Sequence, residues 1–317
     1  MAELDIRPFA GLLGAEVHGL DVASLDEATA RQLQDALRDH LVIALPQLAP
    51  SLAELRDIGA LFGELDTHPY LTPVDPEIPE VISLDSMYTV KADVWHTDAT
   101  FKTDPPAIAL LHMLDCPPHG GDTMFINAHA VYDSLSPALK AFLGTLTCLH
   151  DDGGQGDKKA EHPVVRAHPV TGRPSLFVHK QFSRRIPQLS RPESQMLLTF
   201  LFSWQEQIQF SCRWRWSPGD VVLWDERNTL HAMVNDTEGR RELRRATVLG
   251  DVPVAHSPDQ QAEDFGLPKT ASSGFYGIGS YEFLWLGYPP TTVAASTSQS
   301  KKPALAAPRA ASPSVHR

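Results

Sequence analysis

The stretch VWHTDATF, residues Val94 to Phe101, sets an imidazole and a carboxylate two positions apart in a segment with no helical period. In an extended strand, residues i and i+2 project to the same face, so His96 and Asp98 would point the same way. The two side chains could be ligands of one metal ion, or an ordinary hydrogen-bonded pair at a strand end. Because a lone His-x-Asp pattern is weak evidence for either, the rest of the chain has to decide.

Short apolar runs alternate with Pro, Gly and Asp on both sides of this stretch, and they predict strands. VIAL (42–45) is one such run, and the others are EVISLD (80–85), AIALLHML (107–114), DTMFIN (122–127), SLFVHK (175–180), CRWRW (212–216), DVVLW (220–224) and ELRRATVLG (242–250). Many short strands separated by turn residues are typical of a β-sandwich or barrel-like fold. We therefore expect a mainly β protein.

Helices are expected to flank and interrupt these strands. Capping boxes at 24–27, 51–54 and 190–193 predict three helix starts, and a further helix is expected over about 128–146. Since the strands form one series with helices as insertions, we predict a single domain over residues 1–290.

The C-terminal part of the sequence divides into two segments of different composition. Residues 272–290 are rich in aromatic side chains, which could cover a core edge, the active site or a contact in a homo-oligomer. Residues 291–317 are rich in Ala, Ser and Pro with few large apolar residues, so we expect a disordered tail.

Composition excludes several classes of protein. The chain has 317 residues, of which 42% are hydrophobic, and a formal net charge of -12, which argues against nucleic acid or an anionic membrane as partner. An anionic small-molecule substrate would have to be captured by local Arg or Lys. Three widely spaced cysteines form neither a disulfide framework nor a zinc cluster. With no visible signal peptide or membrane-spanning apolar run, we expect a cytoplasmic protein.

A third metal ligand is expected in WDERNTLHAMVND, residues 224–236, where His231 follows an apolar strand and a polar turn. Two His and one carboxylate on one face of the ion are the ligand set of non-haem Fe(II) oxygenases. Taken alone, His231 would be interpreted as a histidine of a surface loop.

Two arginines downstream predict an anion site. In a strand over 241–249, Arg241 and Arg245 share one face with Leu243 and Thr247, and two guanidiniums there call for two acidic partners. The alternative is a solvated edge strand protected by its charges. In HGGDTMF (119–125), Thr123 begins a strand after a Gly-Gly turn, where its hydroxyl could donate to a carboxylate.

The segments WHTDATF, GGDTMF, HPVVRAHPVTGRPSLFV, CRWRWSPGDVVLWDERNTLH and RRATVLGD occur in this order between about Leu4 and Val254. Together they resemble the taurine dioxygenase family of Fe(II)- and 2-oxoglutarate-dependent dioxygenases, which includes alkylsulfatases and phenoxyacetate herbicide dioxygenases. The resemblance implies a double-stranded β-helix, or jelly roll. It also implies an enzyme that uses Fe(2+), 2-oxoglutarate as cosubstrate and O2, and that releases succinate and CO2 when it hydroxylates its substrate.

The same resemblance implies residue roles. It makes His96, Asp98 and His231 the iron ligands, and it places Thr123 and Arg241 on the distal carboxylate of 2-oxoglutarate. The expected contacts to a small, anionic substrate of the alkyl sulfate, sulfonate or aryloxy acid type are Arg245, His68 and the apolar Phe182.

Two departures from the family bear on the substrate. Ala92 stands where taurine-selective enzymes have Asn, which argues against taurine, and the stretch 148–162 is shorter than the segment that covers the substrate in sulfonate and sulfate members. Three alternatives stay open at this point. They are a dioxygenase for an amino acid-like metabolite, a jelly-roll metal isomerase or hydrolase that does not use 2-oxoglutarate, and a non-catalytic binding protein.

Overall fold

Strand β14 (Val221–Asp225) is buried along its whole length, because it lies inside an eight-stranded sheet that is covered on both faces. The computed structural model describes residues 3–67, 73–87, 92–153 and 158–256. In spatial order the sheet contains β1 (Asp5–Pro8), β2 (Ala15–His18), β3 (Val42–Leu45), β14, β6 (Ile108–Asp115), β16 (Glu242–Val248), β5 (Ile78–Asp85) and β4 (Pro73–Asp75). Its neighbouring strands are antiparallel except for the parallel pair β2 and β3.

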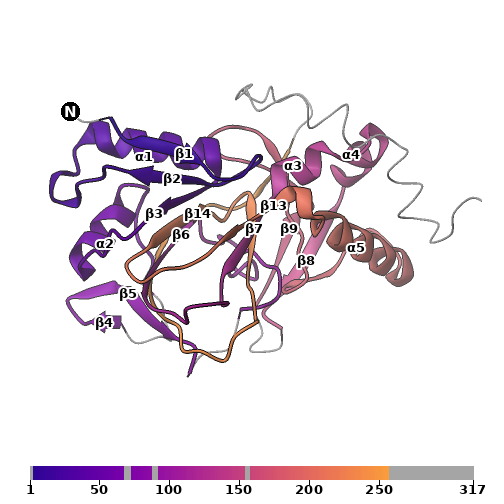
Figure 1. The fold of residues 1–317 in the computed structure, drawn as a ribbon. Coiled ribbons are helices and arrows are strands. Elements are labelled where there is room, and N and C mark those ends of the chain that lie inside the picture. Colours follow the sequence, from indigo (N-terminus) through magenta and orange to yellow (C-terminus); the bar gives the residue numbers. More distant parts are fainter. Residues whose placement is uncertain (1–2, 68–72, 88–91, 154–157, 257–317) are drawn as a thin grey trace, which may run out of the picture. The chain divides into compact units, whose positions relative to one another are not determined.

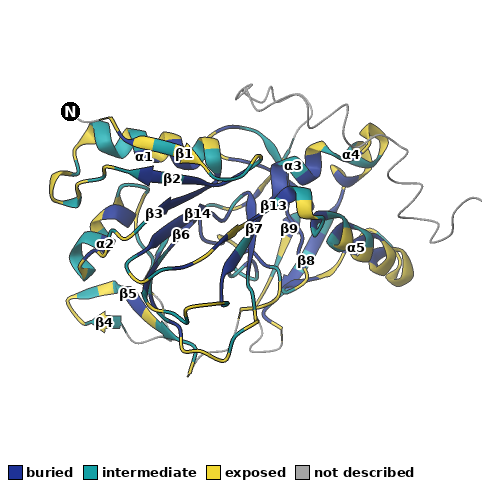
Figure 2. Cartoon of the chain, in the orientation of Figure 1, coloured by how far each residue is buried: buried dark blue, intermediate teal, exposed yellow. Residues whose placement is uncertain are grey.

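Helices α1 (Glu27–His40) and α2 (Leu52–Ala60) cover one face of this sheet (Figure 1). Their apolar side chains, Leu33 and Leu55 among them, pack in one buried cluster with Ile43, Leu110 and Leu223 of the sheet. Burial of this kind contributes roughly 25 cal/mol for each Å² of apolar surface removed from water. The central strands are accordingly buried from end to end (Figure 2).

A three-stranded sheet covers the opposite face. It consists of β13 (Ser211–Trp214), β7 (Thr123–Asn127) and β15 (Thr229–Met233), with β7 in the middle. Phe125 and Trp214 from this sheet pack with Val222, Met113 and Leu243 from the large one. Two facing antiparallel sheets form the jelly roll that was predicted, with its second apolar core between them.

The remaining elements lie around these two sheets. Two further three-stranded sheets hold β8 (Thr147–Asp151), β9 (Lys159–Pro163) and β12 (Ser183–Arg185), and β10 (Val165–Ala167), β11 (Pro174–Leu176) and β17 (Val254–Ala255). The other helices are α3 (Ala128–Asp133), α4 (Pro137–Leu143), α5 (Arg191–Gln205) and the 3-10 turns η1 (Val22–Ser24) and η2 (Ile208–Phe210). None of the helices described is both long and apolar enough to cross a membrane.

The predicted strands are confirmed with shifted ends, but two helix predictions were wrong. The single helix over 128–146 is two helices, because Ser136 caps a new start and Pro137 follows at its first position. The box at 24–27 does not cap α1, since Asp26 does so by accepting from Thr29 N–H. The run SLFVHK is a strand only as far as Leu176.

Two further predictions concern the C-terminal part of the chain. The aromatic segment 272–290 and the tail 291–317 lie outside the described residues. All three cysteines are free thiols.

Candidate metal centre

A backbone bridge brings His96 and His231 together. Strand β15 lies at one edge of the three-stranded sheet, and the segment that carries His96 pairs with it at a single position. The N–H of His96 donates to the carbonyl of His231 (3.1 Å), and the N–H of His231 donates to the carbonyl of His96 (2.8 Å). The two imidazole centroids are consequently 4.1 Å apart. His231 is thus a buried strand residue, and the alternative of a surface-loop histidine was wrong.

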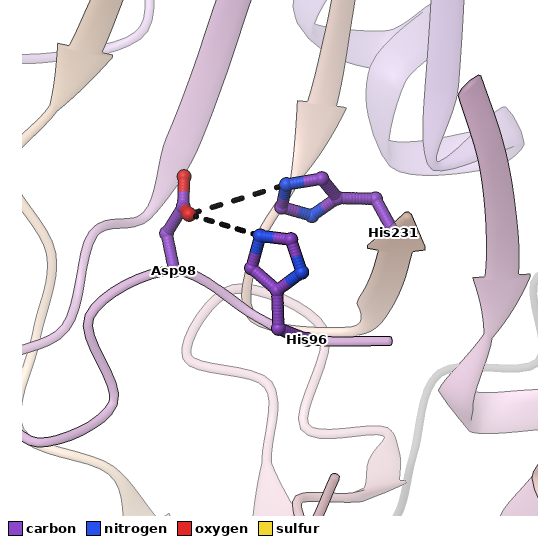
Figure 3. A group of neighbouring side chains, drawn as sticks. All are labelled: His96, Asp98 and His231. Carbon is purple, nitrogen blue, oxygen red and sulfur yellow. Dashed lines mark ion pairs between the residues drawn. The ribbon is translucent and has the colours of Figure 1, made fainter. Parts of the chain in front are cut away.

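Asp98 joins the two imidazoles from a turn. We expected an extended strand through His96 and Asp98, but Asp98 begins a turn in which Ala99 has a φ of 47°. The turn still directs the carboxylate toward the histidines, as Figure 3 shows. Asp98 Oδ1 lies 3.5 Å from His96 Nε2 and 4.0 Å from His231 Nε2.

The donor set and its spacing fit a metal ion. One ligand atom from each of the three residues lies within 4.8 Å of the other two, and both distances to Asp98 are at most 4.0 Å. Within the described part of the chain, this is the one group of three or more His, Cys, Asp or Glu side chains close enough to share an ion. Two imidazoles and one carboxylate suit Fe(II) with open positions.

Protonation in the structure also suits a metal. The Nδ1 of His96 lies 2.7 Å from the carbonyl of Val94, which can only accept, so Nδ1 carries the proton and Nε2 has the free lone pair. Burial, followed by the neighbouring His96, holds the pKa of His231 well below its ordinary value. Burial opposes ionisation of Asp98, but the Arg245 guanidinium and His96 outweigh it and hold the pKa of Asp98 well below its usual range.

Arg241 and Thr123 face the same cavity as the three candidate ligands. Arg241 is buried just before β16, its Nε has no hydrogen-bond partner, and no carboxylate of the described residues forms an ion pair with it. Burial lowers the pKa of Arg241, although Cys116 and Asp122 act in the opposite direction. A buried guanidinium without a counter-ion is costly, so this position calls for an anionic ligand.

Thr123 is poised to donate toward such a ligand. It starts β7, and its Oγ1 accepts a hydrogen bond from the indole N–H of Trp216 at 2.9 Å. The hydroxyl proton is therefore left for another acceptor, because that bond uses only a lone pair of the oxygen.

Arg245 lines the cavity from β16, as the shared face with Arg241 and Leu243 predicted. The edge-strand alternative was wrong, since β16 pairs with β6 on one side and β5 on the other. The guanidinium of Arg245 contacts Oδ2 of Asp98. In the structure its charge therefore balances the candidate ligand carboxylate, and Oδ1 is left to face the imidazoles.

An adjoining cavity extends from Asp98 and Arg245 to Phe182. The ring of Phe182 lies edge-on to Phe101, with centroids 5.2 Å apart, and to His96 at 6.5 Å. His68, the other residue expected to contact substrate, lies outside the described residues.

Sequence reasoning missed Glu226. Its carboxyl group is fully buried and accepts from the N–H of Asp98 (3.0 Å) and from the indole N–H of Trp224 (2.8 Å). Burial raises the pKa of Glu226 well above its ordinary value, and the nearby Asp98 raises it further. A signal was present, because a Glu two residues past the end of the apolar run VVLW of a buried strand is out of place unless it serves a polar site.

Comparison with known proteins gives consistent matches. Residues 5–247 match the family model described as "Taurine catabolism dioxygenase TauD, TfdA family". An alkylsulfatase of Acinetobacter baylyi is 34% identical over 297 residues, which cover 86% of this chain and 92% of the relative. An alpha-ketoglutarate-dependent sulfate ester dioxygenase of Pseudomonas putida is 33% identical, covering 80% of this chain and 91% of that protein.

Solved structures agree with these matches. A taurine dioxygenase from Burkholderia xenovorans superposes with a TM-score of 0.73 at 32% identity, covering 82% of this chain and 94% of that one. A second structure, of AAD-2 in complex with Mn(II) and N-oxalylglycine, gives a TM-score of 0.68 at 26% identity and covers 79% and 99% of the two chains.

Proposed function

Because the chain belongs to the taurine catabolism dioxygenase TauD, TfdA family, we propose that it hydroxylates a small anionic organic substrate of the alkyl sulfate, alkyl sulfonate or aryloxy acid type. It is a 2-oxoglutarate-dependent dioxygenase, an enzyme that uses Fe(II), 2-oxoglutarate and O2. The single observation that supports the rest is the convergence of His96, Asp98 and His231 beside the unpaired, buried Arg241.

The three converging side chains are the iron ligands in this proposal. They come from a turn and a sheet edge that the backbone bridge holds together, so their geometry is set before the metal arrives. Bound Fe(II) supplies the dioxygen chemistry that couples decarboxylation of 2-oxoglutarate to hydroxylation of a substrate C–H bond.

Arg241 and Thr123 bind the distal carboxylate of 2-oxoglutarate in this proposal. A carboxylate in the cavity would neutralise the guanidinium of Arg241 and accept the hydroxyl proton of Thr123. Both groups are buried, and Trp216 holds the Thr123 hydroxyl in place, which orients the cosubstrate at little entropic cost.

The substrate occupies the space between Arg245 and Phe182. Arg245 contacts Asp98 in the structure, and it provides the charge for an acidic group of the substrate once a metal ion balances Asp98. Phe182 and Phe101 provide an apolar wall for the body of the molecule. Ala92 lines the metal cavity and has no side-chain polar atom that could bind the amine of taurine. An anion with an apolar body is therefore favoured over taurine, and the role of His68 stays a prediction.

The alternatives drawn from the sequence receive less support. The curated relatives named above include a sulfate ester dioxygenase that depends on alpha-ketoglutarate, which argues against an isomerase or hydrolase that does not use 2-oxoglutarate and against an amino acid-like substrate. We place the enzyme in the cytoplasm, with a single catalytic domain over residues 1–290 and a disordered tail over 291–317, and a homo-oligomer is compatible with it.

The test uses one anaerobic preparation in two steps. Fe(II) and 2-oxoglutarate should give a weak visible charge-transfer band, and His96→Ala should abolish it. Oxygen is then admitted and succinate is measured across alkyl sulfates, alkyl sulfonates and aryloxy acids. Compared with the wild type at equal intensity of the band, Arg245→Ala should lose at least about 10-fold of substrate-dependent succinate, the effect of one lost charged contact.

The matched control is Arg244→Ala, because Arg244 is the adjacent residue of β16 and does not line either cavity. It should turn over like the wild type. A band that survives in His96→Ala would remove His96 from the metal, and equal turnover in Arg245→Ala would remove Arg245 from the substrate site.

A further inference from the structure

The two candidate histidine ligands differ in what their second ring nitrogen meets. The Nδ1 of His96 has the carbonyl of Val94 at 2.7 Å. The Nδ1 of His231 is buried and has no hydrogen-bond partner. A metal on Nε2 fixes the proton on Nδ1, and a buried N–H needs an acceptor. His231 therefore lacks, in the structure, a contact that a metal-bound histidine almost always makes.

A carboxylate oxygen lies just beyond hydrogen-bond distance of that nitrogen. Glu226 Oε2 is 3.8 Å from His231 Nδ1, and the side chain of Glu226 is completely buried. The same oxygen already accepts from the backbone N–H of Asp98 at 3.0 Å. The other oxygen, Oε1, accepts from the indole of Trp224 at 2.8 Å, which fixes the orientation of the carboxyl group.

Resting on the function proposed above, we propose that Glu226 is a positioning residue for the metal, which accepts the Nδ1 proton of His231 and holds Asp98 through its backbone N–H. The Glu226 carboxyl group then orients two of the three ligands: it holds the imidazole ring of His231 and the backbone N–H of Asp98. A small rotation of the imidazole closes the remaining gap. A carboxylate acceptor also makes His231 a more basic ligand than His96, whose acceptor is a neutral carbonyl.

The arrangement explains why a buried acid is tolerated at this place. Glu226 lies next to Asp98, and two neighbouring carboxyl groups without water disfavour each other. A divalent cation held by Asp98 and His231 compensates for both. The buried Glu226 carboxyl group is therefore unfavourable in the metal-free protein and is compensated when the metal is bound.

The test compares metal affinity with stability in Glu226→Gln, which keeps the size of the side chain. Its amide cannot accept from both the Trp224 indole and the Asp98 N–H, because one end carries only donors. Binding of Co(II), an air-stable probe for the iron site, is measured by calorimetric titration without 2-oxoglutarate. We expect affinity to fall about 10- to 100-fold, as is usual when the hydrogen-bond partner of a metal ligand is lost.

Asp220→Asn is the matched control. Asp220 lies at the other end of β14, is buried, and also accepts two N–H groups, from Gln47 and Ser217. It should lower the melting temperature of the metal-free protein as much as Glu226→Gln does, with Co(II) affinity unchanged. A purely structural Glu226 would give the same result as this control, and that outcome would overturn the proposal.

A second variant, Glu226→Met, fills the same volume without any polar atom and should lose the same affinity. If neither variant folds, Glu226 is a core residue and the positioning role is overturned. If the wild type binds no Co(II), or if His96→Ala binds it as well as the wild type does, the metal site of the proposed function is overturned. If the wild type and Glu226→Gln bind Co(II) equally well, only the positioning role of Glu226 is overturned.

Discussion

Gly121 has two reasons to be glycine, and the second of them concerns Arg241. Its φ is 70°, a conformation that costs L-residues roughly 1–2 kcal/mol. A Cβ at this position would also lie 2.9 Å from Cδ of Arg241. The turn before β7 therefore holds the backbone close against the arginine, and the space for the arginine depends on the absence of a side chain.

We predict that Gly121→Ala raises the KM for 2-oxoglutarate by about 10-fold or more, because it displaces the Arg241 guanidinium that we propose as the partner of the distal carboxylate, a contact worth about 1.5–3 kcal/mol. Affinity for Co(II) should not change. Gly19→Ala is the control, since Gly19 has a φ of 84° and no atom within 4 Å of an added Cβ. It should lower stability similarly and leave KM alone, and an unchanged KM in Gly121→Ala would contradict the prediction.

Among the elements, local rules predicted the strands well and the helix starts less well. Short apolar runs between turn residues marked every strand of the large sheet from β3 onward except β4, because burial on both faces requires nearly continuous apolar residues. The first two strands escaped prediction, since β1 is mostly exposed and leaves no such run. The start of α1 was placed two residues early because Ser24 and Asp26 both favour caps, and only the fold shows that η1 ends at Ser24.

The true caps lead to a stability prediction. Asp26→Ala and Ser51→Ala should each lower the free energy of unfolding by about 1 kcal/mol, because each removes the acceptor of an N-terminal amide of α1 or α2. Ser24→Ala removes only an exposed bond to Asp21 and should cost less than about 0.5 kcal/mol. Urea unfolding measures all three, and equal costs for Ser24→Ala and Asp26→Ala would place the cap at Ser24 after all.

At the scale of the whole molecule, the sequence did not predict the contacts between residues far apart in the chain. His96, Asp98 and His231 were predicted from a resemblance that runs in order along the chain, and the structure brings them together. Local patterns missed the backbone bridge between His96 and His231 and the hydrogen bond from Asp98 N–H to Glu226, because both join residues far apart in the chain. The pairing of Arg245 with Asp98 was missed for the same reason.

Buried histidines give the whole protein a predictable response to acid. Burial, followed by Arg173, lowers the pKa of His129 to about 3, and burial also holds the pKa values of His150 and His179 well below the ordinary range. The unfolded chain takes up these protons near pH 6.5 and the folded chain does not. Stability is therefore complete above about pH 6.5 and is lost as pH falls toward the folded pKa values.

We expect the free energy of unfolding to fall between pH 6 and 5 by about 1.4 kcal/mol per pH unit for each such histidine. His129→Asn, which keeps a donor near the carbonyl of Pro174, should reduce that slope by about one proton. His119→Asn, a change at an exposed histidine, should not. Urea titrations of the metal-free protein at several pH values measure the slopes, and identical slopes for His129→Asn and the wild type would refute the assignment.

The bridge between His96 and His231 has a consequence for the lifetime of the protein. It is an isolated pair of backbone bonds, yet it fastens a turn to the edge of a sheet built from much later residues. Under the proposed function, a metal ion shared by these side chains would link the turn to the sheet edge, adding about 2.7 kcal/mol of stability when its free concentration is a hundred times the dissociation constant. Without iron, the proposed enzyme would lose this contribution to its stability, so iron scarcity would lower the fraction of folded protein as well as the turnover.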